Sequence, residues 1–365
     1  MVQLWAQWVA QTRTILRRLP KNLRSNRWWI VWNGQLYISQ PAAKTIPTRP
    51  ENSSLLAGNL AYVHWSQLLR NPALISAERR AIFLPELGMF GNMTRRLAAA
   101  LTIADALKIG HLVVPESAKF EGSIFETGVH TLNSGVTFWL FSDRGTGNLS
   151  VLVLHKKELA GARNLTRALH APHIDRAWAD LYDVAIPKPT IPAFPSDHLV
   201  IHIRGGDVFG PRKPTSYGQP PLGYYTLILD SSDWAGVTIV HGDWENPVLG
   251  PLIEACQVRG TPPKLQTGLL PADMEVLLTG STLVAGRGTF MPAVVGVSRH
   301  ASKVFFFHDK FSVVPPVAGL EIIRVRDVEG TYVREVLSDN WENSDYQRNL
   351  MLTYPQSNLE LGTLD

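Results

Sequence analysis

The chain has 365 residues, of which 45% are hydrophobic and 18% are charged. A chain of this length has enough apolar residues for about two domains with cores of their own, so we exclude a disordered, collagen-like or disulfide-scaffold protein. Its single cysteine, Cys256, has no partner for an intramolecular disulfide and lies in an apolar, helix-like run. We expect a small core residue there, and a reducing compartment for the protein.

The positive charge is concentrated at one end of the chain. The sequence has 35 Lys and Arg against 31 Asp and Glu, a formal net charge of +4. Residues 1–50 contain eight basic residues and no acidic one, which leaves 27 basic and 31 acidic residues for 51–365. The body of the protein is therefore mildly acidic, and the basic overall charge does not indicate a nucleic-acid partner.

Residues 1–54 form a basic segment with amphipathic character. Leu4, Trp5, Trp8 and Val9 begin an apolar repeat at helical spacing, and arginines are interleaved with it. Such a segment can lie on an anionic membrane surface through residues 1–27, or it can pack on the body or on a partner chain. Its apolar residues precede its charges, unlike those of a secretory signal, and no run is long enough to span a bilayer. We expect a cytoplasmic protein, at the inner membrane face under the first alternative.

An aromatic, strand-like run at 28–32 comes next, followed by a tether-like stretch rich in Pro, Ser and Asn at 41–54. The first domain is expected over 55–186, where short apolar strands alternate with a helix at 94–109. The strands are predicted at 81–86, 111–115, 136–141 and 149–154. This alternation is typical of βαβ units around a buried parallel sheet.

Four prolines within 187–198 exclude a regular helix or strand, and we place the interdomain linker there. A second domain over 199–330 restarts the alternation, with strands predicted at 199–204, 237–241, 282–285 and 303–307 and helices at 221–229, 247–257, 272–279 and 290–297. Residues 331–365 are expected to form a C-terminal helical tail that returns to the first domain. The predicted fold class is α/β, with two doubly wound, Rossmann-like domains that bind ligands beyond the carboxyl ends of their strands.

The most informative segment runs from His202 to Asp207, at the end of the first strand of the second domain. Gly205 and Gly206 would let a ligand approach the backbone closely, and Arg204 offers a planar fork of donors for a diphosphate. Asp207 could orient that fork or accept a proton. The alternative is an ordinary salt bridge at a strand end.

Two further strand ends carry polar residues. The turn that contains Arg287, Gly288 and Thr289 leads into a helix at Phe290, a geometry whose free backbone N–H groups bind phosphate. Thr289 could cap this helix and donate to the diphosphate, whereas a plain helix cap is the alternative. Asp243 follows another strand and could accept from a nucleobase or ribose, or it is a solvated loop acid.

The pattern His202-x-Arg204-x-x-Asp207 resembles the peptide shared by α1,2-, α1,6- and protein O-fucosyltransferases, which are inverting enzymes of the GT-B fold that use GDP-fucose. The resemblance implies two Rossmann-like domains facing across a cleft, with Arg204 on the β-phosphate of GDP. Residues 273–290 resemble the third motif of this family. The segment Gly88-Met-Phe-Gly91-Asn92 resembles its N-terminal Gly-x-x-Asn loop, which faces the donor sugar.

The sequence departs from the family at Gly205, where many α1,2- and α1,6-enzymes have a second arginine. That phosphate contact is either missing or supplied by Arg287 or Arg212, which leaves open whether the sugar is fucose. The alternatives are a GT-B glycosyltransferase that uses another nucleotide sugar, or a non-catalytic protein that binds nucleotide sugars or glycans.

The expected reaction transfers a sugar from GDP-fucose to a hydroxyl of a glycan or glycolipid, with no cofactor and no metal. Arg204, Arg287 and the helix start at Thr289 would stabilise the departing GDP, and the chain has no Asp-x-Asp pattern. The candidate bases are, in order, Asp207, Glu86 and His202. Aromatic residues near the motif, namely Tyr217, Tyr224 and Tyr225, are either acceptor contacts or core residues.

Overall fold

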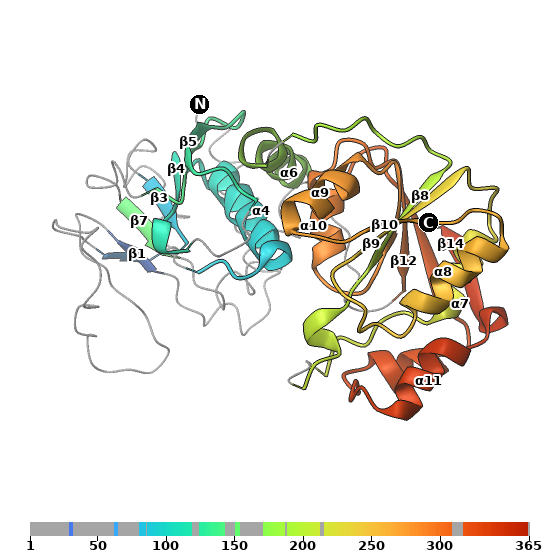
Figure 1. Cartoon of the computed structure of the whole chain (residues 1–365). Helices are drawn as coiled ribbons and strands as arrows, with labels where there is room; N and C mark the ends of the chain where they lie inside the picture. The colour runs from blue at the N-terminus through green and yellow to red at the C-terminus, as the bar shows by residue number, and fades with distance from the viewer. Residues whose placement is uncertain are drawn as a thin grey trace. The chain divides into compact units, whose positions relative to one another are not determined.

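The structure is a computed structural model that describes residues 29–31, 62–64, 80–84, 86–118, 124–142, 150–153, 171–186, 188–211, 215–308 and 317–363. The chain divides into two compact units, Met1–Pro187 and Lys188–Asp365, and the boundary falls within the proline-rich segment (Figure 1). Most of the basic segment 1–54 lies outside the described residues, as does Arg212.

The first unit is built on a seven-stranded sheet with the order β2-β1-β7-β3-β4-β6-β5. Its four central strands are parallel, whereas β1, β2 and β5 run antiparallel to their neighbours. The strands are β1 (Trp29–Val31), β2 (Tyr62–His64), β3 (Arg80–Phe83), β4 (His111–Val114), β5 (Gly128–Thr131), β6 (Thr137–Leu140) and β7 (Ser150–Val153). Two helices, α4 (Phe90–Leu107) and α6 (Ala171–Ala185), pack against each other.

The second unit has a seven-stranded sheet with the order β10-β9-β8-β11-β12-β13-β14. All neighbouring pairs are parallel except β13 with β14. The strands are β8 (His198–Ile203), β9 (Gly236–His241), β10 (Lys264–Gln266), β11 (Thr282–Ala285), β12 (Lys303–Phe307), β13 (Glu321–Asp327) and β14 (Leu359–Thr363). The chain runs outward from β8 to β10, returns to β11 and then runs outward on the other side. The strand order therefore reverses between β8 and β11, as in a Rossmann fold.

Helices cover both faces of the second sheet, with α9 and α10 on one side and α7, α8 and α11 on the other (Figure 1). Their bounds are α7 (Leu222–Leu229), α8 (Leu249–Val258), α9 (Leu270–Thr279), α10 (Phe290–Val297) and α11 (Asp345–Thr353). Because both faces are covered, the central strands are almost wholly apolar, as the residues of β11 illustrate. The predicted α/β fold class, with a Rossmann-like sheet in each half, is confirmed. The cleft between the halves stays a prediction.

Three residues with predicted roles lie in the core of the second unit. The sequence left open whether two of them are core residues or acceptor contacts, and it predicted the third as a core residue. Tyr224 and Tyr225 are buried, and the Tyr224 hydroxyl donates to the carbonyl of Ala285 at 3.1 Å. Both tyrosines are therefore core residues rather than acceptor contacts. Cys256 is fully buried in the same core, as predicted.

The expected return of residues 331–365 to the first domain is wrong. Trp341 is fully buried in the core of the second unit, and its indole Nε1 donates to the carbonyl of Val208 at 2.7 Å. Strand β14 pairs with β13 and extends the second sheet. Burial of Trp341 and Met351 in this core explains why the tail belongs to the second unit.

A second correction concerns the start of the first long helix. We expected this helix at 94–109, but α4 begins at Phe90, and its N-cap is Met89. Gly91 and Asn92 consequently lie in the first helical turn and not in a loop. The N–H groups of this turn have no carbonyl partner within the helix, because a helix leaves its first N–H groups unpaired.

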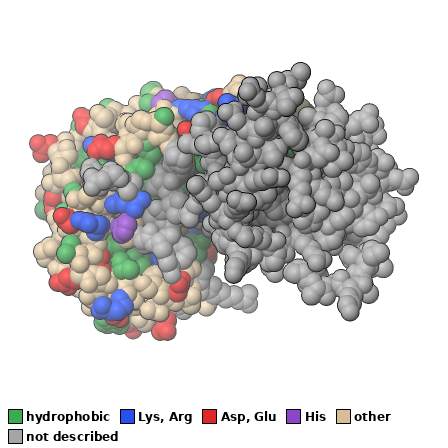
Figure 2. All heavy atoms as spheres, turned by 180° about the vertical axis from the view of Figure 1, so that it is seen from behind, with side chains coloured by type: hydrophobic (Ala, Val, Ile, Leu, Met, Phe, Trp, Pro, Cys, Tyr) green, Lys and Arg blue, Asp and Glu red, His purple; other side chains and the backbone are tan. Residues whose placement is uncertain are grey.

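On the face in Figure 2, acidic and basic side chains of the described residues are interspersed. Among the described helices, none combines the length and the hydrophobicity that a bilayer span requires.

Candidate functional site

The candidate site lies at the carboxyl edge of the second sheet, where β8 and β11 end side by side. In this pair, Leu199 lies opposite Thr282 and Ile201 opposite Val284, so the two parallel strands end at the same edge of the sheet. The strand order reverses between them, and ligands of open α/β sheets bind at such a reversal because the two following connections diverge there. The residues after β8 and β11 are those that the sequence singled out.

Arg204 follows β8 and is held by two neighbours. Its Nη2 lies 3.1 Å from Oδ1 and 3.4 Å from Oδ2 of Asp207, and its guanidinium carbon lies 4.8 Å from the centroid of the Tyr217 ring. The side chain of Arg204 is 22% exposed and that of Asp207 is 66% exposed. The structure therefore brings together an oriented, partly open guanidinium and the carboxylate predicted beside it.

The two glycines after Arg204 lie against Asp243, another of the predicted site residues. Gly206 has a φ of 66°, in the left-handed region that favours glycine. A Cβ atom on Gly205 would lie 2.2 Å from Oδ1 of Asp243. The Asp243 carboxylate thus lies directly against this backbone, and its Oδ1 accepts from the N–H of Glu245 at 2.8 Å. A side chain at position 205 is therefore incompatible with this position of Asp243.

The loop after β11 approaches Arg204 from the other side. Gly288 has a φ of 131°, and a Cβ atom there would lie 2.8 Å from Nη1 of Arg204. Thr289 occupies the N-cap position of α10, but its side chain makes no capping hydrogen bond, contrary to our expectation. The first N–H groups of α10 therefore directly follow the loop that contacts the Arg204 guanidinium.

Arg287 has a different place from the one that we expected. Its side chain is buried, with 4% exposure, and its guanidinium donates to the carbonyls of Ser216, Gly218 and Leu337. The bond to Leu337 is 2.6 Å long. Because these donors already satisfy backbone carbonyls, we no longer assign Arg287 to a ligand: it holds together three segments of the second unit.

His202 lies beneath the site with a buried ring. The ring centroids of His202 and Phe290 are 4.9 Å apart, and Nδ1 of His202 is buried with no hydrogen-bond partner among the described residues. Burial, together with the charge of Arg204, lowers the pKa of His202 to about 3. The imidazole is therefore neutral near pH 7 and a weak base, and Phe290 serves to pack it.

Two amide side chains fix the loops of the site, and the sequence analysis missed both. Asn246 donates through Nδ2 to the carbonyl of Arg204 at 2.9 Å and accepts from the N–H of Val248 at 3.0 Å. Gln219 accepts from the N–H of Arg287 at 3.1 Å and donates to the carbonyl of Tyr217 at 2.9 Å. Both are buried. Neither lies inside an apolar tract, since Asn246 follows two acidic residues in its loop and Gln219 stands between a glycine and two prolines, so no sequence pattern marked them as buried.

An aromatic side chain stands beside Asp243 at the end of β9. Trp244 is 63% exposed, and its ring centroid lies 5.1 Å from that of His241. Nδ1 of His241 lies 3.1 Å from the carbonyl of Asp243, so this nitrogen carries the proton that the carbonyl accepts. Nε2 is then an acceptor, and it is buried with no partner among the described residues.

The remaining predicted site residues belong to the first unit. Glu86 is exposed, and it follows β3, which lies between β7 and β4. The strand order of the parallel part reverses between β3 and β7, so this loop also lies at a switch point. Contact of Glu86, Gly91 or Asn92 with a donor sugar bound by the second unit stays a prediction. Within the described ranges, no group of three or more His, Cys, Asp or Glu residues could hold a metal ion.

No family model matches the sequence. No curated protein matches it either. A search of solved structures found the crystal structure of POFUT1 in complex with GDP, with a TM-score of 0.38, 11% identity and coverage of 65% of this chain and 99% of that chain.

The same search found the E. coli ADP-heptose lps heptosyltransferase II, with a TM-score of 0.33, 9% identity and coverage of 67% and 89%. It also found the E. coli heptosyltransferase WaaC with ADP-2-deoxy-2-fluoro heptose, with a TM-score of 0.31, 9% identity and coverage of 66% and 94%. At TM-scores this low, the likeness by itself assigns no function.

Proposed function

We propose that the chain is an inverting, metal-independent glycosyltransferase that transfers a sugar from a nucleoside-diphosphate donor to a hydroxyl of a glycan or glycolipid. GDP-fucose is the donor that we favour. The observation that carries the proposal is the position of Arg204 at the reversal of strand order, oriented by Asp207 and Tyr217 and flanked by glycine backbone.

The diphosphate is assigned to Arg204 and the start of α10. Cleavage of the bond between sugar and diphosphate leaves negative charge on the departing nucleotide, and preorganised donors stabilise that charge. Arg204 supplies a planar fork of N–H groups. The first N–H groups of α10 add the positive end of a helix dipole. This positive charge is the reason that the proposal assigns no metal to the leaving group.

The nucleoside is assigned to the end of β9. The Asp243 carboxylate accepts hydrogen bonds, and guanine offers two neighbouring donors on one edge, whereas uracil offers one. The exposed ring of Trp244 adds a flat apolar surface beside it. These features favour GDP, although a carboxylate also accepts from ribose hydroxyls, which every nucleotide sugar carries.

The transfer step forms one bond and breaks one. The acceptor oxygen forms a bond to the anomeric carbon from the face opposite the diphosphate, while the bond from that carbon to the diphosphate oxygen breaks and its electron pair leaves with GDP. The acceptor proton passes to a carboxylate. Asp207 is the first candidate because it lies beside Arg204, and Glu86 of the first unit is the second.

The test is the release of GDP from GDP-fucose, with water or with an added glycan as acceptor. Arg204→Ala should lower the rate by about a hundredfold or more, as loss of one preorganised donor does in other enzymes. The matched control is Arg259→Ala, since Arg259 belongs to the same unit but pairs with Asp230 at 2.7 Å. Full activity in Arg204→Ala would contradict the proposal.

A non-catalytic nucleotide-sugar-binding protein is the second candidate. It is favoured by the ion pair that already engages Asp207, and by the weak basicity of His202. Binding of GDP-fucose without release of GDP, across a panel of glycan acceptors, would select this candidate.

A further inference from the structure

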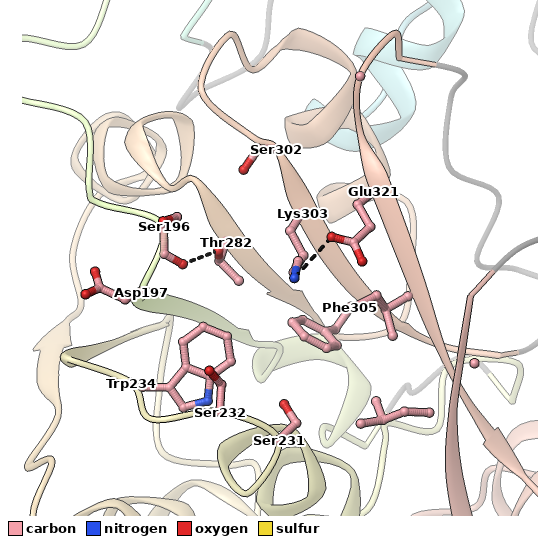
Figure 3. A pocket seen from close by; sticks show the side chains of 14 residues that line it. Ser196, Asp197, Ser231, Ser232, Trp234, Thr282, Ser302, Lys303, Phe305 and Glu321 are labelled. Carbon is pink, nitrogen blue, oxygen red and sulfur yellow. Dashed lines mark hydrogen bonds and ion pairs between the residues drawn. The ribbon is translucent and has the colours of Figure 1, made fainter.

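A pocket of about 720 Å³ opens at the amino edge of the second sheet, the edge opposite the candidate site (Figure 3). Its floor is made by the first residues of three parallel strands, Thr282 of β11, Lys303 of β12 and Glu321 of β13. The loop after α7 forms its wall with Ser231, Ser232 and Trp234. All of its lining residues belong to the second unit.

Hydroxyl groups dominate the polar lining of this pocket. Thr282 donates its hydroxyl hydrogen to the carbonyl of Ser196 at 2.7 Å, and Ser231 donates to the carbonyl of Ile228 at 2.7 Å. Thr282 is only 1% exposed, so its hydroxyl ties the start of β11 to the preceding segment, whereas Ser231 is exposed and its oxygen keeps lone pairs that can accept from a ligand. Ser232 and Ser302 also line the pocket and are exposed. The pocket is therefore suited to a ligand that carries many hydroxyl groups.

The charged residues of the pocket compensate one another. Nζ of Lys303 lies 3.1 Å from Oε2 of Glu321, and the two residues are register partners on neighbouring strands. Figure 3 shows this ion pair as a dashed line. A phosphorylated ligand would compete with Glu321 for the lysine and meet the nearby carboxylate of Asp197. The charge distribution thus disfavours anions and suits a neutral ligand.

Two aromatic residues complete the pocket. The ring centroids of Trp234 and Phe305 are 6.4 Å apart at an interplanar angle of 82°. The Trp234 Nε1 donates to the carbonyl of Ile228 at 3.0 Å, which fixes the orientation of the ring. Trp234 is partly exposed, so a rigid apolar surface lies next to the hydroxyl groups. Sugar rings combine these two properties, because their C–H faces are apolar and their edges carry hydroxyl groups.

We propose that this pocket is a binding site for a neutral oligosaccharide, separate from the site at Arg204. Ligand pockets of about 300–1,000 Å³ enclose drug-sized molecules, and a disaccharide or trisaccharide belongs to this size class. The proposal rests on the lining of the pocket and does not require the chain to be a transferase.

Saturation-transfer difference NMR on the full chain tests the proposal with three neutral disaccharides as probes: cellobiose, lactose and maltose. At least one should give signals, and Ser232→Arg should weaken its binding by about tenfold or more, because the long cationic side chain occupies the pocket. Ser357→Arg places the same side chain at an exposed serine outside the lining and should leave the signals unchanged. Arg204→Ala should also leave them unchanged.

Several outcomes would overturn the proposal: no signal from any of the three sugars, signals that survive Ser232→Arg, or signals lost in Arg204→Ala. A positively charged ligand is tested with spermidine in the same experiment. Glu321→Gln removes the carboxylate charge and should abolish binding of a cation while sparing a neutral sugar. The assignment to carbohydrate would be contradicted if the sugars gave no signals and spermidine gave signals that both Ser232→Arg and Glu321→Gln remove.

Discussion

Arg287→Ala should destabilise the second unit strongly, whereas Arg204→Ala should change its stability little. The Arg287 guanidinium is buried and donates to the carbonyls of Ser216 and Leu337, among others. A hydrogen bond to a charged group contributes about 1.5 kcal/mol at the lower end of its range, so loss of these two bonds costs about 3 kcal/mol. In a unit of this size, that cost corresponds to a fall in Tm of about 6–12 °C.

The ion pair of Arg204 with Asp207 is partly exposed, and such pairs contribute at most about 1 kcal/mol. Thermal unfolding followed by circular dichroism compares the two variants with the unmodified chain, and calorimetric titration with GDP compares their binding. We expect Arg287→Ala to lower Tm, and Arg204→Ala to lose GDP affinity at nearly constant Tm. The reasoning is refuted if Arg287→Ala leaves Tm unchanged, or if the two variants have the same profile.

Three further predictions concern other residues. Burial lowers the pKa of His202 to about 3, so below pH 6.5 the unfolded chain binds a proton that the folded chain does not. The free energy of unfolding should therefore decrease as the pH is lowered from about 6.5 to 3, by up to about 1.4 kcal/mol per pH unit. Urea unfolding of His202→Asn should show a shallower pH dependence. Gly288→Ala should strain the backbone by about 1 kcal/mol and displace Arg204, and unchanged GDP affinity would argue against this contact. Burial raises the pKa of the Cys256 thiol to about 11, so a thiol reagent should label Cys256 only in the unfolded chain, and rapid labelling of the folded protein would contradict its place in the core.

The strands of the second sheet could be predicted from the sequence because they are buried on both faces. Strand β11, Thr282–Ala285, and strand β12, Lys303–Phe307, have the predicted bounds. Continuous apolar runs of this length between glycine or polar residues leave little choice of register. By contrast, β10, β13 and β14 lie toward the edges of the sheet and carry polar residues in many positions, and no periodicity identified them.

The candidate site could be located from the sequence, but the roles of its side chains could not. Arg204 and Arg287 both follow strands and precede glycines, and only the folded chain shows that the first is partly open and the second is buried. The direction of a long side chain depends on carbonyl groups from distant segments, such as that of Leu337. The steric reason for glycine at position 205 likewise comes from Asp243, which is brought there by the pairing of β8 with β9.

Calorimetric titration with GDP and UDP tests the central claim most directly, namely that Arg204 at the reversal of strand order holds a nucleoside diphosphate. We predict that the unmodified chain prefers GDP, and that Arg204→Ala binds it about tenfold to a hundredfold more weakly, as loss of a charged hydrogen-bond donor implies. Equal affinity of the unmodified chain and Arg204→Ala for GDP would contradict this claim, and a preference for UDP would contradict the choice of GDP-fucose as the donor.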